Sequence, residues 1–143
     1  MAPRLVRARD EPQRPLAMGP SDDPVLITGG LGALGREVAR WLVEVHGVSK
    51  LILTSRRGPE APGASDFAEE LASLGGEAQV VACDVSELES LKRALDGVAL
   101  RGVIHAAGIL DDGLLSTQSP ERLERVMRPK VDGAWNLHQV TVG

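Results

Sequence analysis

Residues 25–35 read VLITGGLGALG, an apolar run that passes into a glycine-rich turn in which Gly30, Gly32 and Gly35 have the G-x-G-x-x-G spacing. In such a turn one glycine allows the tight bend, one lets a pyrophosphate approach bare backbone, and one lets the following helix pack closely on the strand. The amides at the start of that helix then face the phosphates. The segment therefore predicts a dinucleotide-binding loop, with a simple tight turn as the alternative. The predicted cofactor-binding residues of the loop are Thr28, Gly29, Gly30, Leu31, Gly32, Ala33, Leu34 and Gly35.

Strand and helix patterns alternate outward from this loop. We expect strands at residues 25–28, 51–54, 78–83 and 102–105, and helices at 34–46, 65–74, 86–95 and from 119 onward. The first helix is expected because the apolar residues Leu34, Val38, Trp41, Leu42 and Val45 recur at helical spacing. Ser86 and Glu89 have the spacing of a capping box, and Pro129 predicts a bend in the last helix. The alternation predicts an α/β fold: the N-terminal half, about four strands, of a Rossmann-like doubly wound parallel sheet.

The chain has 143 residues and a formal net charge of −4, with 20 acidic residues against 16 basic ones. This balance gives no basic face for nucleic acid, and the few aromatic side chains offer no stacking platform for a single strand. Cys83 is the single cysteine, which excludes an intramolecular disulfide and a multi-cysteine zinc site, so no metal is expected. No apolar run approaches the ~20 residues of a membrane helix and no secretory signal opens the chain, so we expect a cytoplasmic protein without a membrane partner.

Residues 9–24 contain four prolines and mixed charge with little to bury, which predicts a linker. We therefore expect residues 1–23 to be a tail and linker. The organised, dinucleotide-binding domain is expected to span residues 24–143.

The end of the second predicted strand indicates which dinucleotide is bound. An NAD site has an acidic residue there, about 20 residues past the loop, which hydrogen-bonds the ribose 2′-hydroxyl. Here the strand runs into Arg56 and Arg57. A guanidinium is always charged and suits a 2′-phosphate, which a carboxylate would repel. We therefore expect NADP; the alternative is a pair of solvated loop charges.

Further candidates follow the third and fourth predicted strands. Asp84 can accept a hydrogen bond from the adenine amino group, or it can be a helix-start carboxylate. Small residues at positions 106–108 let the backbone approach a flat ligand. His105 is interpreted as a strand-end histidine, because the three histidines have no metal-ligand spacing. Cys83 is interpreted as a small buried side chain, because no basic residue is placed to activate it.

In combination, these motifs resemble those of a known family. TGGLGALG, SRRG, CDV and HAAG occur in the order found in a short-chain dehydrogenase/reductase. With LDDG at 110–113 and RPKVDGAWNLH at 128–138, residues 24–138 resemble a ketoreductase domain of a modular type I polyketide synthase. The stretch PRLVR at 3–7 resembles the end of the non-catalytic subdomain that precedes the catalytic one in such domains.

The resemblance implies a role for each motif. NADP would be the cofactor, with its pyrophosphate on the loop 28–35. The other implied cofactor residues are Ser55, Arg56 and Arg57 at the 2′-phosphate, Asp84 and Val85 at the adenine, and Ala106, Ala107 and Gly108 at the nicotinamide ribose. Lys130 would be a catalytic lysine, whereas its spacing alone indicates a solvated lysine on a surface helix.

The loop residues Leu110, Asp111 and Asp112 resemble the Leu-Asp-Asp fingerprint of the stereochemical class called B-type. The resemblance implies a product with a D-configured β-hydroxyl. Without it, the two aspartates are plain loop carboxylates or an acid/base pair.

The chain departs from the family at one point, because the reaction needs a serine and a tyrosine and the chain has no tyrosine. We therefore expect the cofactor-binding portion, inactive by itself, of an enzyme that reduces a carrier-bound β-ketoacyl chain with NADPH. Its expected partners are the polyketide chain on an acyl carrier protein and the remainder of the synthase. Two alternatives are a non-catalytic nucleotide-binding scaffold and an extended short-chain enzyme such as a nucleotide-sugar epimerase.

Overall fold

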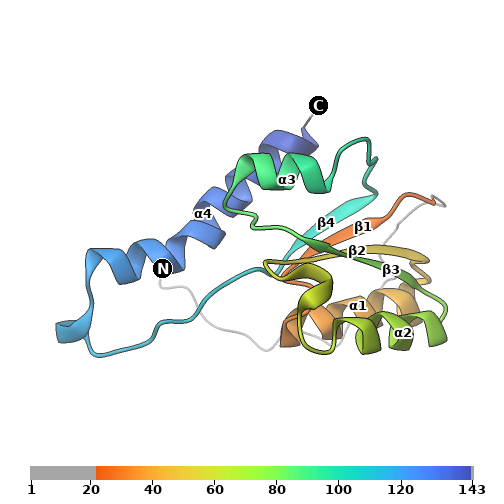
Figure 1. The fold of residues 1–143 in the computed structure, drawn as a ribbon, viewed down its shortest axis with the longest axis horizontal. Coiled ribbons are helices and arrows are strands. Elements are labelled where there is room, and N and C mark those ends of the chain that lie inside the picture. Colours follow the sequence, from red (N-terminus) through yellow and green to blue (C-terminus); the bar gives the residue numbers. More distant parts are fainter. Residues whose placement is uncertain (1–21, 143) are drawn as a thin grey trace, which may run out of the picture.

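The four predicted strands form one parallel sheet in the computed structural model, which describes residues 22–142. The strands are β1 (Val25–Thr28), β2 (Lys50–Ser55), β3 (Glu77–Ala82) and β4 (Gly102–His105), in the order β3-β2-β1-β4 (Figure 1). The chain moves outward from β1 through β2 to β3 and then returns to the other side of β1. This reversal creates a switch point between β1 and β4 at the carboxyl edge, which is where open α/β sheets bind ligands.

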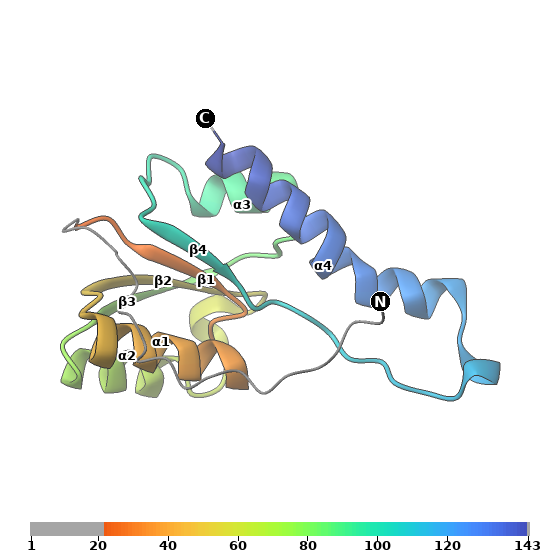
Figure 2. The same cartoon turned by 180° about the vertical axis from the view of Figure 1, so that it is seen from behind.

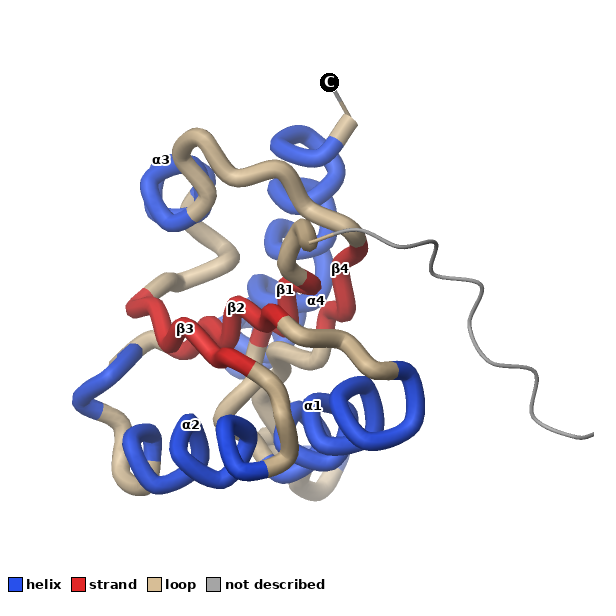
Figure 3. The backbone as a smooth tube through the Cα atoms, turned by 90° about the vertical axis from the view of Figure 1, so that its right-hand side faces the viewer, coloured by secondary structure: helices blue, strands red, loops and turns tan. Residues whose placement is uncertain are grey.

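Two layers of helices cover the sheet. Helices α1 (Ala33–His46) and α2 (Ala64–Ser73) lie on one face, and α3 (Leu88–Ala94) and α4 (Pro120–Thr141) lie on the other, as the end view in Figure 3 shows. Short 3₁₀ turns, η1 (Gly58–Glu60) and η2 (Leu115–Thr117), lie in the connections after β2 and β4. The predicted fold, half of a Rossmann-like doubly wound sheet, is confirmed.

Strand β1 is buried on both of its faces, because each face meets a helical layer. Val25 and Ile27 pack in the cluster that includes Phe67 of α2. Leu26 packs in the opposite cluster, which includes Leu137 of α4. A continuous apolar run is therefore required at this position, as is usual for a parallel strand covered on both sides.

The buried face of α1 contains only one of the five apolar residues that recur at helical spacing, Leu42. Leu34 and Val45 are 66% and 59% exposed. The buried residues of the helix are Gly35, Ala39, Leu42 and Val43. The helix contacts the strand layer closely, and this contact selects small side chains where hydrophobicity alone favours the bulky positions.

The capping box predicted for α3 is absent. The helix begins at Leu88, and its N-cap residue Glu87 makes no side-chain capping bond. Ser86 is drawn to Asp84 instead: its amide and its hydroxyl donate to Asp84 Oδ1 at 3.0 and 2.6 Å. A nearby ionised carboxylate therefore takes the hydroxyl that the box would have used.

Helix α4 begins as its sequence predicts and continues through its internal proline. Ser119 Oγ accepts a hydrogen bond from the Arg122 amide at 3.3 Å, and Pro120 lies in the first turn. The first turns of the helix run at an angle to the rest (Figure 2). Pro129 lies inside the helix and removes one backbone donor, which is the usual cause of such a bend.

Residues 1–21 of the expected tail and linker, including the PRLVR stretch, lie outside the described residues. Within residues 22–142, no helix has the length and hydropathy needed to cross a membrane. The same residues contain no group of three or more side chains that could hold a metal ion.

Candidate cofactor site

A cavity of about 460 Å³ opens at the carboxyl edge of the sheet. Gly29 and Gly32 of the glycine-rich loop form one wall. The end of β2 with the next residue (54–56) lines the cavity as well. So do the segments that follow β3 and β4, at 83–86 and 106–109, and one side of the first turns of α4. The structure thus gathers around one space the predicted cofactor motifs that are far apart in sequence.

The glycines of the loop are required by close backbone contacts. Gly29 has φ +65°, and a Cβ on it would lie 2.8 Å from the backbone N and Cα of Ala107. A Cβ on Gly35 would lie 2.7 Å from Gly30 Cα, and a Cβ on Gly30 would lie 2.9 Å from Leu53 Cβ. These three glycines let the loop after β1 approach β2, the turn after β4 and the start of α1.

Gly32 differs from the other glycines of the loop, because a Cβ on it would meet only the Gly29 carbonyl oxygen, at 3.2 Å. It is the N-cap of α1 and lines the cavity. The first amides of a helix have no partner within the helix and attract anions. This bare backbone at a helix start fits a pyrophosphate, as the spacing predicts.

Three further residues of the loop do not line the cavity. Leu31 packs against the core cluster under α1, Ala33 begins the helix, and Leu34 is exposed. None of these three side chains lines the cavity.

Thr28 and His105 join the switch point to α4. The Thr28 hydroxyl lies 2.6 Å from His105 Nδ1 and accepts a hydrogen bond from the Ala107 amide at 3.3 Å. His105 Nε2 lies 2.9 Å from the Pro129 carbonyl oxygen, which can only accept, so Nε2 carries the hydrogen. In the neutral ring Nδ1 then accepts from Thr28. The interpretation of His105 as a structural strand-end residue agrees with these contacts.

Lys130 is the residue after Pro129, the residue whose carbonyl oxygen lies 2.9 Å from His105 Nε2. It lies beside the turn after β4. A Cβ on Gly108 would lie 3.9 Å from Lys130 Cε. The helix is held there by further contacts with the segment after β3: Asn136 Nδ2 donates to the Val85 carbonyl at 3.0 Å, and a Cβ on Gly133 would lie 2.9 Å from Val85 Cγ2. The structure thus brings the predicted catalytic lysine to the 106–108 turn.

Only two of the three residues predicted at the 2′-phosphate line the cavity. Arg56 lines the cavity and has an exposed side chain, whereas Arg57 is exposed and does not line it. Ser55 also lines the cavity, and its hydroxyl accepts a hydrogen bond from the Gly58 amide at 3.0 Å. Arg56 is therefore the cation that the end of β2 offers to a ligand.

Asp84 and Val85, the predicted adenine residues, both line the cavity. Partial burial raises the pKa of Asp84, but the two hydrogen bonds from Ser86 and the nearby Arg128 and Arg56 outweigh it, so that the pKa lies below its usual value. Asp84 is thus an ionised acceptor near neutral pH. Cys83 is buried, and burial raises the pKa of its thiol, which agrees with a small core side chain rather than a nucleophile.

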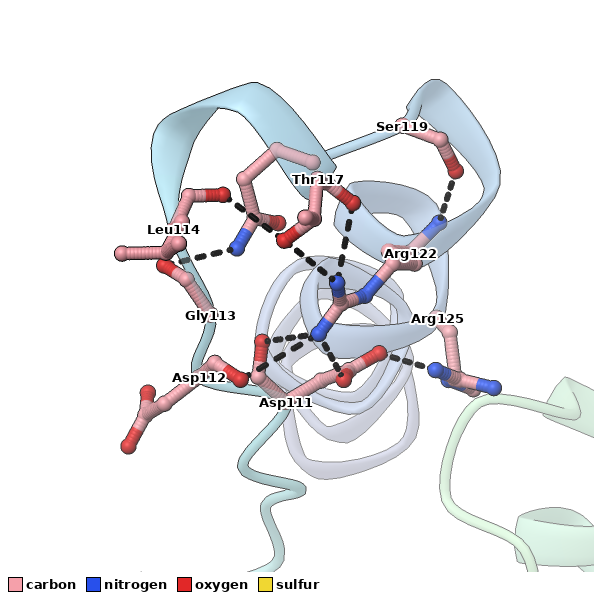
Figure 4. A network of polar contacts seen from close by, with 9 residues as sticks. Asp111, Asp112, Gly113, Leu114, Thr117, Ser119, Arg122 and Arg125 are labelled. Atoms are coloured by element: carbon pink, nitrogen blue, oxygen red, sulfur yellow. Dashed lines mark hydrogen bonds and ion pairs between the residues drawn. The ribbon is translucent and has the colours of Figure 1, made fainter.

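The Leu110–Asp112 segment is folded around an arginine of α4 (Figure 4). Arg122 Nη2 donates to Asp111 Oδ1 at 2.5 Å and to the Asp112 carbonyl at 3.2 Å, and Arg125 pairs with the other carboxylate oxygen of Asp111. These bonds lower the pKa of Asp111 to about 2. Asp111 is therefore a structural carboxylate rather than one half of an acid/base pair.

The neighbours of Asp111 are exposed. The Leu110 side chain is 82% exposed, and the Asp112 side chain points away from the network. Neither residue lines the cavity. The predicted loop residues therefore lie beside the cofactor cavity rather than in it.

Three arginines of α4 are functional candidates that the sequence analysis missed. Arg122 organises the loop, and Arg125 and Arg128 line the cavity. Their spacing of three residues places them on one side of the helix, but this signal is the same as that of a solvated surface. Their partners, Asp111 in the loop before the helix and Glu87 in the segment after β3, come together with them only in the folded chain.

Comparison with known proteins identifies the family. Residues 24–143 match the family described as "KR domain". The chain is 50% identical over 133 residues to "Polyketide synthase GfsB" of Streptomyces halstedii, covering 90% of this chain and 2% of that protein. It is also 50% identical over 122 residues to "Erythronolide synthase EryA2" of Saccharopolyspora erythraea, covering 84% of this chain and 3% of that protein.

Solved structures give the same result. The structure titled "The first ketoreductase of the tylosin PKS" matches with a TM-score of 0.78 and 51% identity, over 83% of this chain and 26% of that chain. "Structure of A-type Ketoreductases from Modular Polyketide Synthase" matches with a TM-score of 0.76 and 39% identity, over 84% of this chain and 26% of that chain. The chain thus spans a few per cent of the polyketide synthases it matches and about a quarter of these ketoreductase structures. It belongs to the KR domain family, the ketoreductase domains of polyketide synthases.

Proposed function

We propose that this chain supplies the NADP-binding part of a ketoreductase that converts a carrier-bound β-ketoacyl chain to the β-hydroxyacyl chain. The observation that supports this most strongly is the single cavity in which the bare backbone of Gly32, the cation of Arg56 and the small 106–108 turn meet. A pyrophosphate, a 2′-phosphate and a nicotinamide with its ribose need these three surfaces.

NADP is proposed over NAD because the β2 side of the cavity has Arg56 where an NAD site has a carboxylate. Ser55 completes the turn by accepting from the Gly58 amide, which orients the backbone that carries Arg56. Asp84 has an ionised carboxylate at the adenine end, where it can accept from an amino group.

In this proposal one residue of the chain, Lys130, acts near the reacting groups. NADPH, when bound, supplies the hydride that reduces the keto group. Lys130 holds a positive charge beside the 106–108 turn, where it can stabilise negative charge that develops near the nicotinamide ribose. Since the chain has no tyrosine, the proton for the carbonyl oxygen comes in this proposal from a group outside these 143 residues.

The substrate, the partners and the stereochemistry belong to the same proposal. The polyketide chain would arrive on an acyl carrier protein, within the remainder of the synthase and in the cytoplasm. The Leu110–Asp112 segment favours the B-type, D-configured product. Because a structure described as A-type matches this fold with a TM-score of 0.76, the class is assigned from these loop residues and not from the fold.

Fluorescence titration of the 143-residue chain with NADPH and NADH tests the cofactor. We expect NADPH to bind more tightly, and Arg56→Ala to weaken NADPH by about 1.5–3 kcal/mol while leaving NADH nearly unchanged, since only NADPH has the 2′-phosphate. Lys50→Ala is the matched control, because it removes an exposed charge at the opposite end of β2. Equal affinities of the wild type for the two cofactors would refute the 2′-phosphate site.

The absence of tyrosine favours one alternative, a chain that binds the nucleotide without chemistry. The absorbance of NADPH with a simple β-keto thioester separates binding from turnover. We expect no turnover by the chain alone. Turnover above a protein-free control that is lost in Lys130→Ala would show that another acid of this chain donates the proton.

A further inference from the structure

The glycine-rich loop is held on its outer side by one side chain, that of Arg36 in the first turn of α1. Its Nε donates to the Leu31 carbonyl at 3.1 Å, and its Nη2 donates to the Gly63 carbonyl at 3.0 Å. Leu31 belongs to the loop, and Gly63 is the N-cap of α2. Arg36 does not line the cavity, so it reaches a ligand there through the backbone that it holds.

The contact with Leu31 fixes the plane of one peptide bond. The Leu31 carbonyl and the Gly32 amide belong to the same planar trans peptide, in which C=O and N–H point in opposite directions. The Gly32 amide donates to the Gly29 carbonyl at 2.9 Å. This peptide is therefore held at both ends, and it immediately precedes the first amides of α1, which have no partner within the helix.

The guanidinium of Arg36 is itself held in one orientation. Its Cζ lies 4.5 Å from the centroid of the Phe67 ring, and Phe67 is fully buried in the core under α1 and α2. A guanidinium is planar and its donors form a rigid fork. A fixed ring on one face and two backbone carbonyls at the edge therefore leave this side chain little freedom to turn, and the loop peptide that it contacts is held with it.

We propose that Arg36 is a positioning residue for the pyrophosphate of the cofactor: it holds the Leu31–Gly32 peptide so that the first amides of α1 stay aimed at the phosphates. The proposal rests on the proposed function, because it assumes that NADP binds in this cavity. The 2′-phosphate side does not depend on this peptide, since Arg56 lines the cavity at the end of β2. The effect of Arg36 is therefore specific to ligands that have the pyrophosphate.

The test compares two ligands of the full 143-residue chain, NADPH and adenosine 2′-monophosphate, which has the 2′-phosphate but no pyrophosphate. Arg36→Met keeps the aliphatic stem and removes both donors. We expect it to weaken NADPH about tenfold and to leave adenosine 2′-monophosphate within about twofold of the wild type. Arg36→Lys keeps the charge but loses the planar fork, so we expect it to weaken NADPH by about threefold or more.

Arg40→Met is the matched control. Arg40 lies on the same helix, with its Cζ 5.3 Å from the centroid of the same Phe67 ring, but it pairs with Glu37 and Glu70 instead of loop carbonyls. We expect this variant to bind both ligands as the wild type does, and thermal unfolding checks that all the variants are folded.

Hydrogen exchange of the Gly32 amide in the ligand-free chain measures the same contact without a cofactor. We expect faster exchange there in Arg36→Met than in Arg40→Met, with equal exchange of the β1 amides in both variants.

The inference is wrong if Arg36→Met weakens both ligands equally, because Arg36 then acts on overall stability. It is also wrong if Arg36→Lys binds NADPH like the wild type, because charge alone is then sufficient, or if Gly32 exchanges alike in the two methionine variants. In each of these cases NADPH still binds to the wild type and the proposed function stands. If the wild type binds neither ligand, the proposed function and the inference both fail.

Discussion

The glycine-rich side of the cavity is built from backbone, whereas the side formed by α4 and the loop before it is built from charged side chains. On the first side, a Cβ on Gly29 would lie 2.8 Å from Ala107, so a single added carbon has no place. On the second side, Arg122 and Arg125 hold Asp111, and Arg128 pairs with Glu87, all in partly exposed positions. One cavity therefore combines a tightly packed backbone side with a side held by partly exposed ion pairs.

The largest effect is expected on the backbone side, in Gly29→Ala. Alanine at φ +65° is strained, and its Cβ would in addition collide with the turn after β4. We expect a loss of about 3 kcal/mol in the free energy of unfolding, measured by urea denaturation, together with loss of NADPH binding.

Gly47→Ala is the matched control for this change. Gly47 has nearly the same φ, +62°, but nothing lies within 4 Å of the added Cβ. Its cost should be about 1 kcal/mol, the strain alone. Equal losses in the two variants would show that the close backbone contact of Gly29 contributes nothing to the free energy of unfolding. The proposed difference between the two sides of the cavity would then be wrong.

A smaller effect is expected at the junction between the two sides. Thr28→Val removes the hydroxyl that lies between His105 Nδ1 and the Ala107 amide. Two partners are then left without their bond, and we expect the free energy of unfolding to fall by about 2 kcal/mol.

Thr54 lies opposite Thr28 on the neighbouring strand and makes an internal control. Both residues are fully buried, but Thr54 Oγ1 has no hydrogen-bond partner among the described residues. Thr54→Val should therefore be neutral or stabilising in the same denaturation experiment. If Thr54→Val lowers the free energy of unfolding as much as Thr28→Val does, side-chain packing rather than hydrogen bonding accounts for the effect of both substitutions.

The same contrast explains how much could be predicted from the sequence. The strands were predicted within one residue of their observed ends, and the glycine loop was predicted because close backbone contacts leave glycine as the residue that fits. The apolar spacing of α1 does not identify its buried face, because the contact with the strand layer favours Gly35 and Ala39 over a bulkier neighbour such as Leu34. Such a preference depends on the distance between layers, which no local pattern contains.

The charged side of the cavity, formed by α4 and the loop before it, was not predicted from the sequence, for a different reason. Arg122, Arg125 and Arg128 recur every three residues on a surface helix, a pattern that solvated helices share. Their partners come from the loop before the helix and from the segment after β3. Ion pairs between elements depend on side-chain reach and on the fold already formed, so they follow from the structure and not from spacing.

The smallest effect is expected on the charged side of the cavity, for the variant Asp111→Asn. The folded pKa of Asp111 is about 2, below its ordinary value of 3.8. A carboxyl whose pKa is lowered by folding stabilises the folded state above its unfolded pKa, and this contribution is lost as the pH falls from about 4 to 2. The variant should therefore be slightly less stable than the wild type at pH 7, and the difference should vanish near pH 2. Amide hydrogen exchange of the Thr117 and Gln118 turn measures the same loss locally, because Arg122 anchors that turn.

Asp112→Asn is the matched control for this last change, because it alters the neighbouring carboxylate, which points away from the arginines (Figure 4). Its stability should follow that of the wild type from pH 7 to pH 2. If the two variants have the same stability from pH 7 to pH 2, the net charge of the loop accounts for the effect of both substitutions. The ion pairs of Asp111 then do not stabilise the charged side of the cavity. If Asp111→Asn alone loses protection at Thr117 while NADPH affinity is unchanged, the loop and the phosphate cradle are energetically separate, as their different construction predicts.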